Sequence, residues 1–148
     1  MPEVYNYMQK MRKAYVLYGT EAYLPTLEQC ALSITAVSDI PVLIYLMGDS
    51  SIFLKYNIYI HKNATIIPWH IDLTDNDLYD KDLTGNFYIK RGNKDIYNIL
   101  TERIAIIEDA LLNHADTVVY VDSDSVATEN LDRIFHMYNG ELYVLATE

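Results

Sequence analysis

The chain has 148 residues, the size of one ordinary domain, and 51% of them are hydrophobic, which is typical of a folded protein rather than a disordered one. Its formal net charge of −10 argues against nucleic acid and anionic membranes as partners, because both are negatively charged. No apolar run approaches the roughly 18 residues of a membrane span, and the first residues lack the apolar stretch of a signal peptide. We therefore expect a cytoplasmic protein without a membrane span.

The first half of the chain alternates between strand and helix patterns. Residues 14–18 are β-forming and run into Gly19-Thr20, which predicts a strand and a turn. From Tyr23 to Val37, apolar residues recur every three or four positions, which predicts an amphipathic helix. The single cysteine, Cys30, excludes an internal disulfide, and we expect it in the core of that helix rather than as a nucleophile.

Two further strands are predicted before residue 70. Residues 41–47 form a short continuous apolar run, as in a buried parallel strand, and residues 64–69 form a weaker one. Between them, Ser50 or Ser51 is expected to cap a short helix that runs through Tyr56.

The second half continues the alternation after a polar segment, residues 72–92, which we expect to be irregular. Residues 95–112 predict a long helix, with an apolar face expected at Ile96, Ile99, Leu100, Ile104, Ile107, Ala110 and Leu111. Residues 117–121 predict a buried strand, 131–137 a short helix and 142–145 a last strand. This order predicts an α/β fold with a mainly parallel sheet, in which ligands bind outside the carboxyl ends of the strands.

The chemistry is expected at Asp122-Ser123-Asp124, directly after the predicted strand 117–121. Two carboxylates this close repel each other, so a proton or a cation is needed beside them. Hard oxygen ligands favour Mg²⁺ or Mn²⁺, and such a metal can hold a diphosphate and act as a Lewis acid. The alternative is a purely structural role, in which both aspartates only form the turn after the strand.

The segment from Tyr120 to Phe135 resembles the DxD segment of glycogenin-like, family 8 glycosyltransferases, in which a strand, Asp-x-Asp and an Asn-Leu-Asp step lead to a short helix. Residues 18–23 resemble the first loop of that family, and the helix before Asp122 also matches. The resemblance covers roughly residues 14–146. It implies a Rossmann-like GT-A nucleotide-diphospho-sugar transferase sheet and metal-dependent transfer of a sugar from a UDP-sugar, with retention of configuration.

The resemblance also implies roles for individual residues. Asp122 and Asp124 bind Mn²⁺ or Mg²⁺, and Asp122 also approaches the donor nucleotide. The other donor-nucleotide-binding residues are Gly19 and Thr20 at the base and ribose, Tyr23 beside the base, and Arg103 at the diphosphate. Glu21 departs from the aspartate usual in the family, which weakens the case for a role of its side chain in binding. No residue is identified as a catalytic nucleophile or base.

The resembled family continues well beyond the point that corresponds to Glu148, so we expect a donor half without the acceptor half, and a homodimer through the exposed seam. A non-catalytic nucleotide-sugar-binding module or fragment therefore stays open beside the enzyme. A haloacid-dehalogenase-like phosphatase also fits Asp122 to Val126, although no lysine follows them. A plain α/β interaction domain is a third alternative. Asp80 to Gly85 begins like an EF-hand loop, but Arg91 stands where the last ligand is required.

Overall fold

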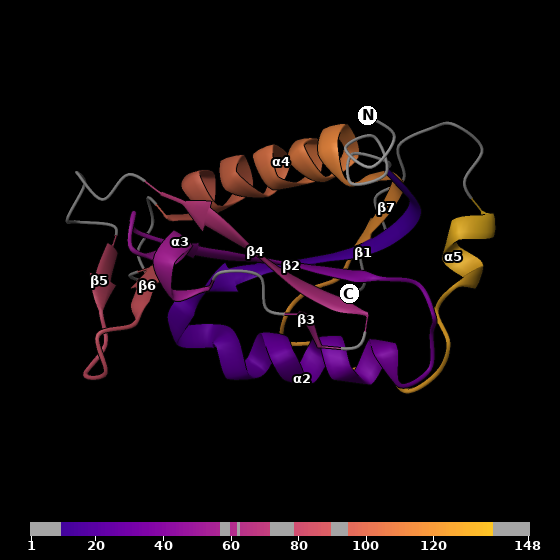
Figure 1. The fold of residues 1–148 in the computed structure, drawn as a ribbon, viewed down its shortest axis with the longest axis horizontal. Helices are drawn as coiled ribbons and strands as arrows, with labels where there is room; N and C mark the ends of the chain where they lie inside the picture. The colour runs from indigo at the N-terminus through magenta and orange to yellow at the C-terminus, as the bar shows by residue number, and fades with distance from the viewer. Residues whose placement is uncertain (1–9, 57–59, 62, 72–78, 90–94, 138–148) are drawn as a thin grey trace, which may run out of the picture.

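The protein is an α/β structure in which two layers of helices cover a central sheet (Figure 1). This computed structural model describes residues 10–56, 60–61, 63–71, 79–89 and 95–137. The sheet has the strand order β3-β4-β2-β1-β7. Four of the strands are parallel: β1 (Met11–Thr20), β2 (Val42–Gly48), β4 (Ala64–His70) and β7 (Ala115–Tyr120). The short strand β3 (Ile60–His61) pairs antiparallel with β4. The predicted α/β fold is confirmed.

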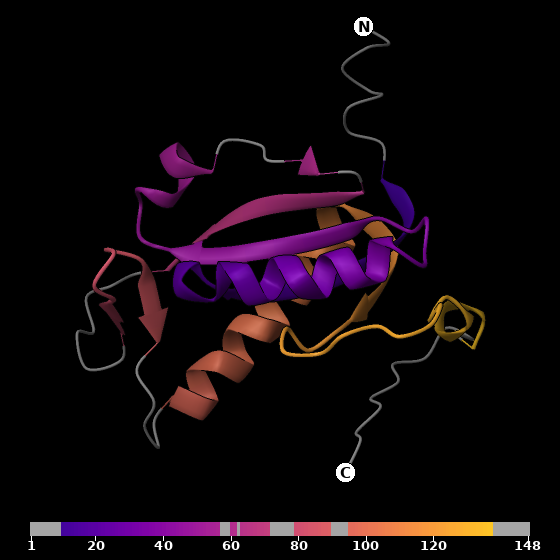
Figure 2. The ribbon, with the colours of Figure 1, turned by 90° about the horizontal axis from the view of Figure 1, so that it is seen from below.

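The chain moves outward from β1 through β2 to β4 and then crosses back to β7 on the other side of β1, and this determines where a ligand can bind. The connection from β1 to β2 contains the 3-10 helix η1 (Glu21–Tyr23) and helix α2 (Leu24–Thr35), which cover one face. The connection from β4 to β7 contains helix α4 (Asp95–Asn113), which covers the other face (Figures 1 and 2). The strand order therefore reverses between β1 and β7. Ligands of open α/β sheets bind at such a switch point, where the loops on the two sides diverge.

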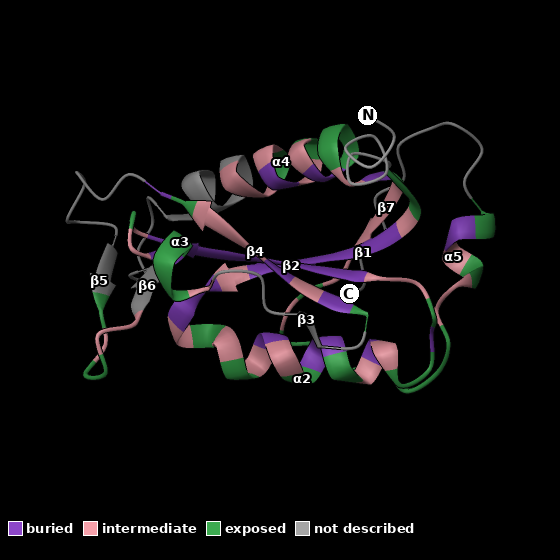
Figure 3. Ribbon diagram, in the orientation of Figure 1, coloured by how far each residue is buried: buried purple, intermediate pink, exposed green. Residues whose placement is uncertain are grey.

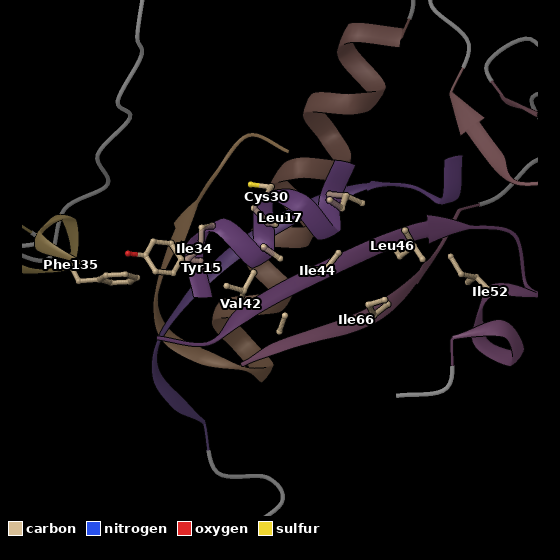
Figure 4. Packing of buried hydrophobic residues seen from close by; sticks show 13 residues of the cluster. Tyr15, Leu17, Cys30, Ile34, Val42, Ile44, Leu46, Ile52, Ile66 and Phe135 are labelled. Carbon is tan, nitrogen blue, oxygen red and sulfur yellow. The ribbon is translucent and has the colours of Figure 1, made fainter. Parts of the chain in front are cut away.

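Strands β1 and β2 carry the core on both of their faces (Figure 3). Side chains alternate along a strand, so Tyr15 and Leu17 pack under α2, whereas Val16 and Tyr18 pack under α4. Figure 4 shows the cluster on the α2 side, where Tyr15 meets Phe135 edge to face, with their ring centroids 5.1 Å apart. Burial on both faces explains why these strands are continuously apolar in sequence.

Helix α4 faces the sheet with a set of residues that matches the predicted one only in part. Of the predicted residues, Ala110 is fully buried and Ile107 half-buried, whereas Ile104 is 66% exposed and Leu111 is 38% exposed. Ile106, which was not predicted, is also fully buried, and the side chains of Ile96, Ile99 and Leu100 lie outside the described residues. Residues 104–107 are all apolar and point to different sides of this helix, so the periodicity of the sequence did not determine which side faces the sheet. The observed register puts Arg103, three residues before Ile106, on the side that faces the strands.

The segment predicted to be irregular contains a hairpin of strands β5 (Tyr79–Lys81) and β6 (Phe87–Ile89). Its turn is closed by Asp82, whose carboxylate accepts hydrogen bonds from the backbone N–H groups of Thr84 and Asn86, at 2.9 Å each. Gly85 has φ +83°, a conformation that side chains disfavour. The aspartates that begin like an EF-hand loop thus form part of a hairpin, and β6 lies against η1 at the carboxyl edge of the sheet.

Two other expectations need correction. Strand β7 is not buried: it is the edge strand among the described residues, and its side chains from Thr117 to Tyr120 are only half-buried. The short helix α3 (Ile52–Lys55) has no capping bond from a serine side chain; instead, the carboxylate of Asp49 accepts the backbone N–H of Ser51 at 2.9 Å.

The remaining expected elements agree within a few residues. Helix α5 (Arg133–His136) is shorter than the expected 131–137, and the expected strand at 142–145 lies outside the described residues. Within the described part of the chain, no helix has the length and apolar character needed to cross a membrane.

Candidate functional site

The carboxyl ends of β1 and β7 lie side by side at the switch point of the sheet. Val16 pairs with Tyr120, and the backbone N–H of Val121 donates to the carbonyl of Val16 at 3.0 Å, so the pairing continues to the edge of Asp122. The same register brings Thr20, at the end of β1, to this edge. Residues about 100 positions apart in sequence are therefore neighbours here, as the parallel order predicts.

The two aspartates stand in an exposed turn. Both Asp122 and Asp124 are exposed, and the backbone N–H of Ser125 closes the turn by donating to the carbonyl of Asp122 at 3.0 Å. The thiol of Cys30 donates to the same carbonyl, at 3.7 Å, from beneath the turn. Cys30 is 1% exposed, and its burial, together with the charges of Asp122 and Asp124, raises its pKa to about 11. The prediction that this cysteine is a core residue is confirmed.

Helix α2 holds the segment that follows the aspartates. The hydroxyl of Ser33 accepts the backbone N–H of Ala127 at 2.9 Å, and the side chain of Asn130 donates to the carbonyl of Val37 at 2.7 Å. Cys30 and Ser33 lie three positions apart on one side of the helix, and Val37 follows just after its end, so the contacts come from the second half of α2 and the turn behind it. These contacts fix the backbone on the far side of the turn.

The aspartates fit a divalent cation that shares its coordination with a phosphate ligand. No group of three His, Cys, Asp or Glu side chains lies together as a metal site in the described ranges. Mg²⁺ and Mn²⁺ commonly take only one or two carboxylates and complete their coordination with water and substrate phosphates. Two exposed carboxylates in a turn fixed by backbone hydrogen bonds supply that kind of donor set.

Arg103 reaches the same edge from α4. Its guanidinium carbon lies 4.8 Å from the ring centroid of Tyr120 and 5.8 Å from that of Tyr18, and its Nε–H donates to the Tyr18 hydroxyl at 3.4 Å. The two rings are themselves 5.7 Å apart. Arg103 forms no ion pair with a carboxylate within the described residues.

The pKa values of Tyr120 and Arg103 are shifted both by burial and by the charged groups around them. Burial raises the pKa of Tyr120, and the neighbouring Tyr18 and Asp122 add to that effect, whereas Arg103 opposes it. Burial alone lowers the pKa of Arg103, but the hydrogen bond to Tyr18 and the charges of Tyr120, Tyr18 and Asp122 outweigh it, and the pKa is raised. The guanidinium is therefore a permanent, half-buried cation that lies over the two tyrosine rings.

The first loop contributes three of the expected donor-binding residues. Thr20 is 3% exposed, and its hydroxyl has no hydrogen-bond partner among the described residues. Tyr23 is 46% exposed at the start of α2. Gly19 has a packing reason to be glycine, because a Cβ there would lie 3.0 Å from Cδ1 of Leu27. The structure thus gathers Thr20, Asp122 and Arg103 at one edge.

Two ion pairs hold the other side of this edge. Glu21 is 1% exposed, and its Oε2 lies 3.2 Å from Nζ of Lys55 on α3. Asp49, which follows β2, lies 3.1 Å from Nζ of Lys81 in the β5–β6 hairpin. Hydrogen bonds from Ser51 and Lys81 lower the pKa of Asp49 to about 2. Through Oε2, Glu21 joins the first loop to α3, whereas its buried Oε1 has no hydrogen-bond partner among the described residues.

The sequence interpretation missed Tyr18, Tyr120 and Ser33. The alternation of each strand was a usable signal for the tyrosines, since both lie two positions before a predicted site residue and share its face. Ser33 gave no signal, because its partner is a backbone group 94 positions away.

Comparison with models of known protein families, with curated proteins and with solved structures gave no match for this chain.

Proposed function

We propose that this chain binds the UDP part of a UDP-sugar together with Mn²⁺ or Mg²⁺, and that it is the donor-binding part of a glycosyltransferase of GT-A type. The observation that carries the proposal is the position of Arg103. It is a half-buried cation without a carboxylate partner among the described residues, and it lies over Tyr18 and Tyr120, the residues two positions before Thr20 and Asp122 at the switch point. In a protein of net charge −10, a local cation of this kind needs an explanation.

A nucleoside diphosphate complements this arrangement. Its phosphates accept hydrogen bonds from the guanidinium of Arg103, which binds phosphate well because its N–H groups form a fork. Asp122 and Asp124 hold the divalent cation, which supplies a Lewis acid for the leaving diphosphate. Thr20 has a buried hydroxyl without a hydrogen-bond partner among the described residues, which a small shift of the first loop would turn to the ribose or base, and Tyr23 has an exposed ring for stacking. Arg103 stabilises negative charge on the leaving group during transfer.

The second candidate is a module that binds the same nucleotide without transferring the sugar. The features at the donor edge, Arg103 and the two aspartates, serve binding as well as transfer, so they support this module equally. Release of free sugar from UDP-glucose or UDP-galactose, measured with Mn²⁺ present, supports the transferase. Tight binding of UDP without any turnover supports the module.

The test of both is calorimetry with UDP, in Mn²⁺ and in EDTA. We expect binding with Mn²⁺, and a loss of at least tenfold in affinity in EDTA or in Asp122→Ala/Asp124→Ala, because the charge of the diphosphate is then uncompensated. Asp116→Ala is the matched control: it removes an exposed carboxylate from the opposite end of β7. Equal binding in wild type with EDTA and with Mn²⁺ contradicts a metal-held diphosphate. No binding at all removes the donor site.

A further inference from the structure

We infer that Tyr18 and Tyr120 are positioning residues, which hold the guanidinium of Arg103 at the carboxyl edge so that it meets the diphosphate. The inference rests on the proposed function and assigns to that site two residues that do not themselves contact the ligand.

The two tyrosines share one face of two adjacent strands. Tyr18 lies two residues before Thr20, and Tyr120 lies two residues before Asp122. Side chains two positions apart on a strand point to the same face, here the α4 face. The two rings therefore lie next to the edge of the sheet that carries the site residues, and Arg103 packs on them from α4.

The two tyrosines restrain the side chain of Arg103 in two ways. Tyr120 offers its ring face at 4.8 Å, within the distance at which a cation is attracted by the ring quadrupole. Tyr18 accepts the Nε–H at 3.4 Å, which selects one edge of the guanidinium. No other hydrogen bond or ion pair of Arg103 occurs within the described residues. Its terminal N–H groups therefore keep their capacity to donate to phosphate oxygens.

Holding the side chain in this way has a reason in binding energetics. A free arginine side chain loses rotamer freedom when it binds a ligand, and that loss weakens the complex. Contact with two rings and one hydrogen bond restricts that freedom before the ligand arrives. Partial burial over the rings also makes each hydrogen bond to phosphate stronger than it is in water.

The experiment is a set of UDP titrations in Mn²⁺ with variants of Tyr120, which is only half-buried and tolerates replacement better than the buried Tyr18. Tyr120→Leu keeps an apolar side chain but removes the ring, and we expect UDP affinity to fall about fivefold. Tyr120→Phe keeps the ring face, so its affinity should stay within about twofold of wild type. Thermal unfolding of each variant confirms that it is folded.

Two readouts separate positioning from a general structural effect. In an Arg103→Met background, Tyr120→Leu should cause no further loss, because residues that act through one another are not additive. Binding of uridine, which has no phosphate, should be the same in wild type and Tyr120→Leu. The inference is overturned by any one of three results. Tyr120→Leu lowers UDP affinity as much in the Arg103→Met background as in wild type, or it lowers uridine affinity as much as UDP affinity, or it leaves UDP affinity unchanged.

These outcomes are distinct from failure of the proposed function. If wild type shows no metal-dependent UDP binding, then the proposed function is wrong and the inference falls with it. If wild type binds UDP and loses affinity in Asp122→Ala/Asp124→Ala but not in Tyr120→Leu, then only the inference is wrong.

Discussion

The hydroxyl of Ser33 accepts the backbone N–H of Ala127 at 2.9 Å and so joins the middle of α2 to the segment that leaves the aspartate turn. The same hydroxyl donates to the carbonyl of Cys30 at 2.7 Å. One side chain thus serves the helix and the loop together. The aspartates of this turn are exposed, but hydrogen bonds from α2 hold the backbone on which they lie.

Ser33→Ala tests that relationship. The backbone N–H of Ala127 loses its partner, and we expect the free energy of unfolding to fall by about 1 kcal/mol, measured by urea titration. The affinity for UDP with Mn²⁺ should also fall, because the turn becomes less ordered. Thr35→Ala is the control, since that hydroxyl donates only to the carbonyl of Leu32 in its own helix. If both variants lose equally, the bond to the loop has no special importance.

Asp132 anchors the far end of the same segment. Its carboxylate accepts hydrogen bonds from the hydroxyls of Tyr15 and Ser38 at 2.6 Å each, and these bonds lower its pKa against the opposing effect of burial. We expect Asp132→Ala to reduce the free energy of unfolding by about 2 kcal/mol, because two donors lose a charged acceptor. Asp116→Ala, at an exposed carboxylate, should change it little. Similar losses in the two variants contradict this assignment.

Asp49 should make stability depend on pH in acid. Its pKa is lowered to about 2 in the folded chain, from an ordinary 3.8, by hydrogen bonds from Ser51 and Lys81. The stabilisation is therefore fully present above pH 3.8 and is lost as the pH falls toward 2. We expect wild type to exceed Asp49→Ala by about 1 kcal/mol at pH 6, allowing for the exposed Lys81.

The measurement for Asp49 is urea unfolding of both proteins between pH 2 and pH 6. The difference between them should shrink only in the acid part of that range. A difference that stays constant from pH 6 to pH 2 means that the carboxylate is not preferentially ionised in the folded chain.

Gly48 is expected to resist substitution because of close contact rather than backbone conformation. A Cβ there would lie 2.7 Å from Cδ1 of Ile52 and 3.1 Å from Oε1 of the buried Glu21. We expect Gly48→Ala to lower the free energy of unfolding by about 1–3 kcal/mol. Adding Ile52→Val, which removes Cδ1, should recover part of that loss relative to Ile52→Val alone. Strict additivity of the two changes contradicts a direct contact.

The expected homodimer stays a prediction. Helix α4 leaves Ile104 and Leu112 exposed by 66% and 63%, and light scattering over a range of concentrations decides whether copies of the chain associate. A monomer at the highest concentration contradicts the expected dimer.

The elements that depend on local patterns could be predicted from the amino-acid sequence alone. Strands β1 and β2 are short apolar runs, and α2 has regular apolar spacing, so their existence and their order followed from residues close together in the chain. That order also predicted that Thr20 and Asp122 would meet, because parallel strands place their carboxyl ends at one edge.

Packing between residues far apart in the chain determined the rest. Residues 104–107 of α4 are all apolar, so packing against the sheet, and not periodicity, selected Ile106 for the core and put Arg103 over the tyrosines. The β5–β6 hairpin lies in the mostly polar segment 72–92 and is held in part by the pair of Lys81 with Asp49, 32 positions earlier. Long-range contacts of this kind leave no periodic signal, because each partner is free to be any residue that fits the other.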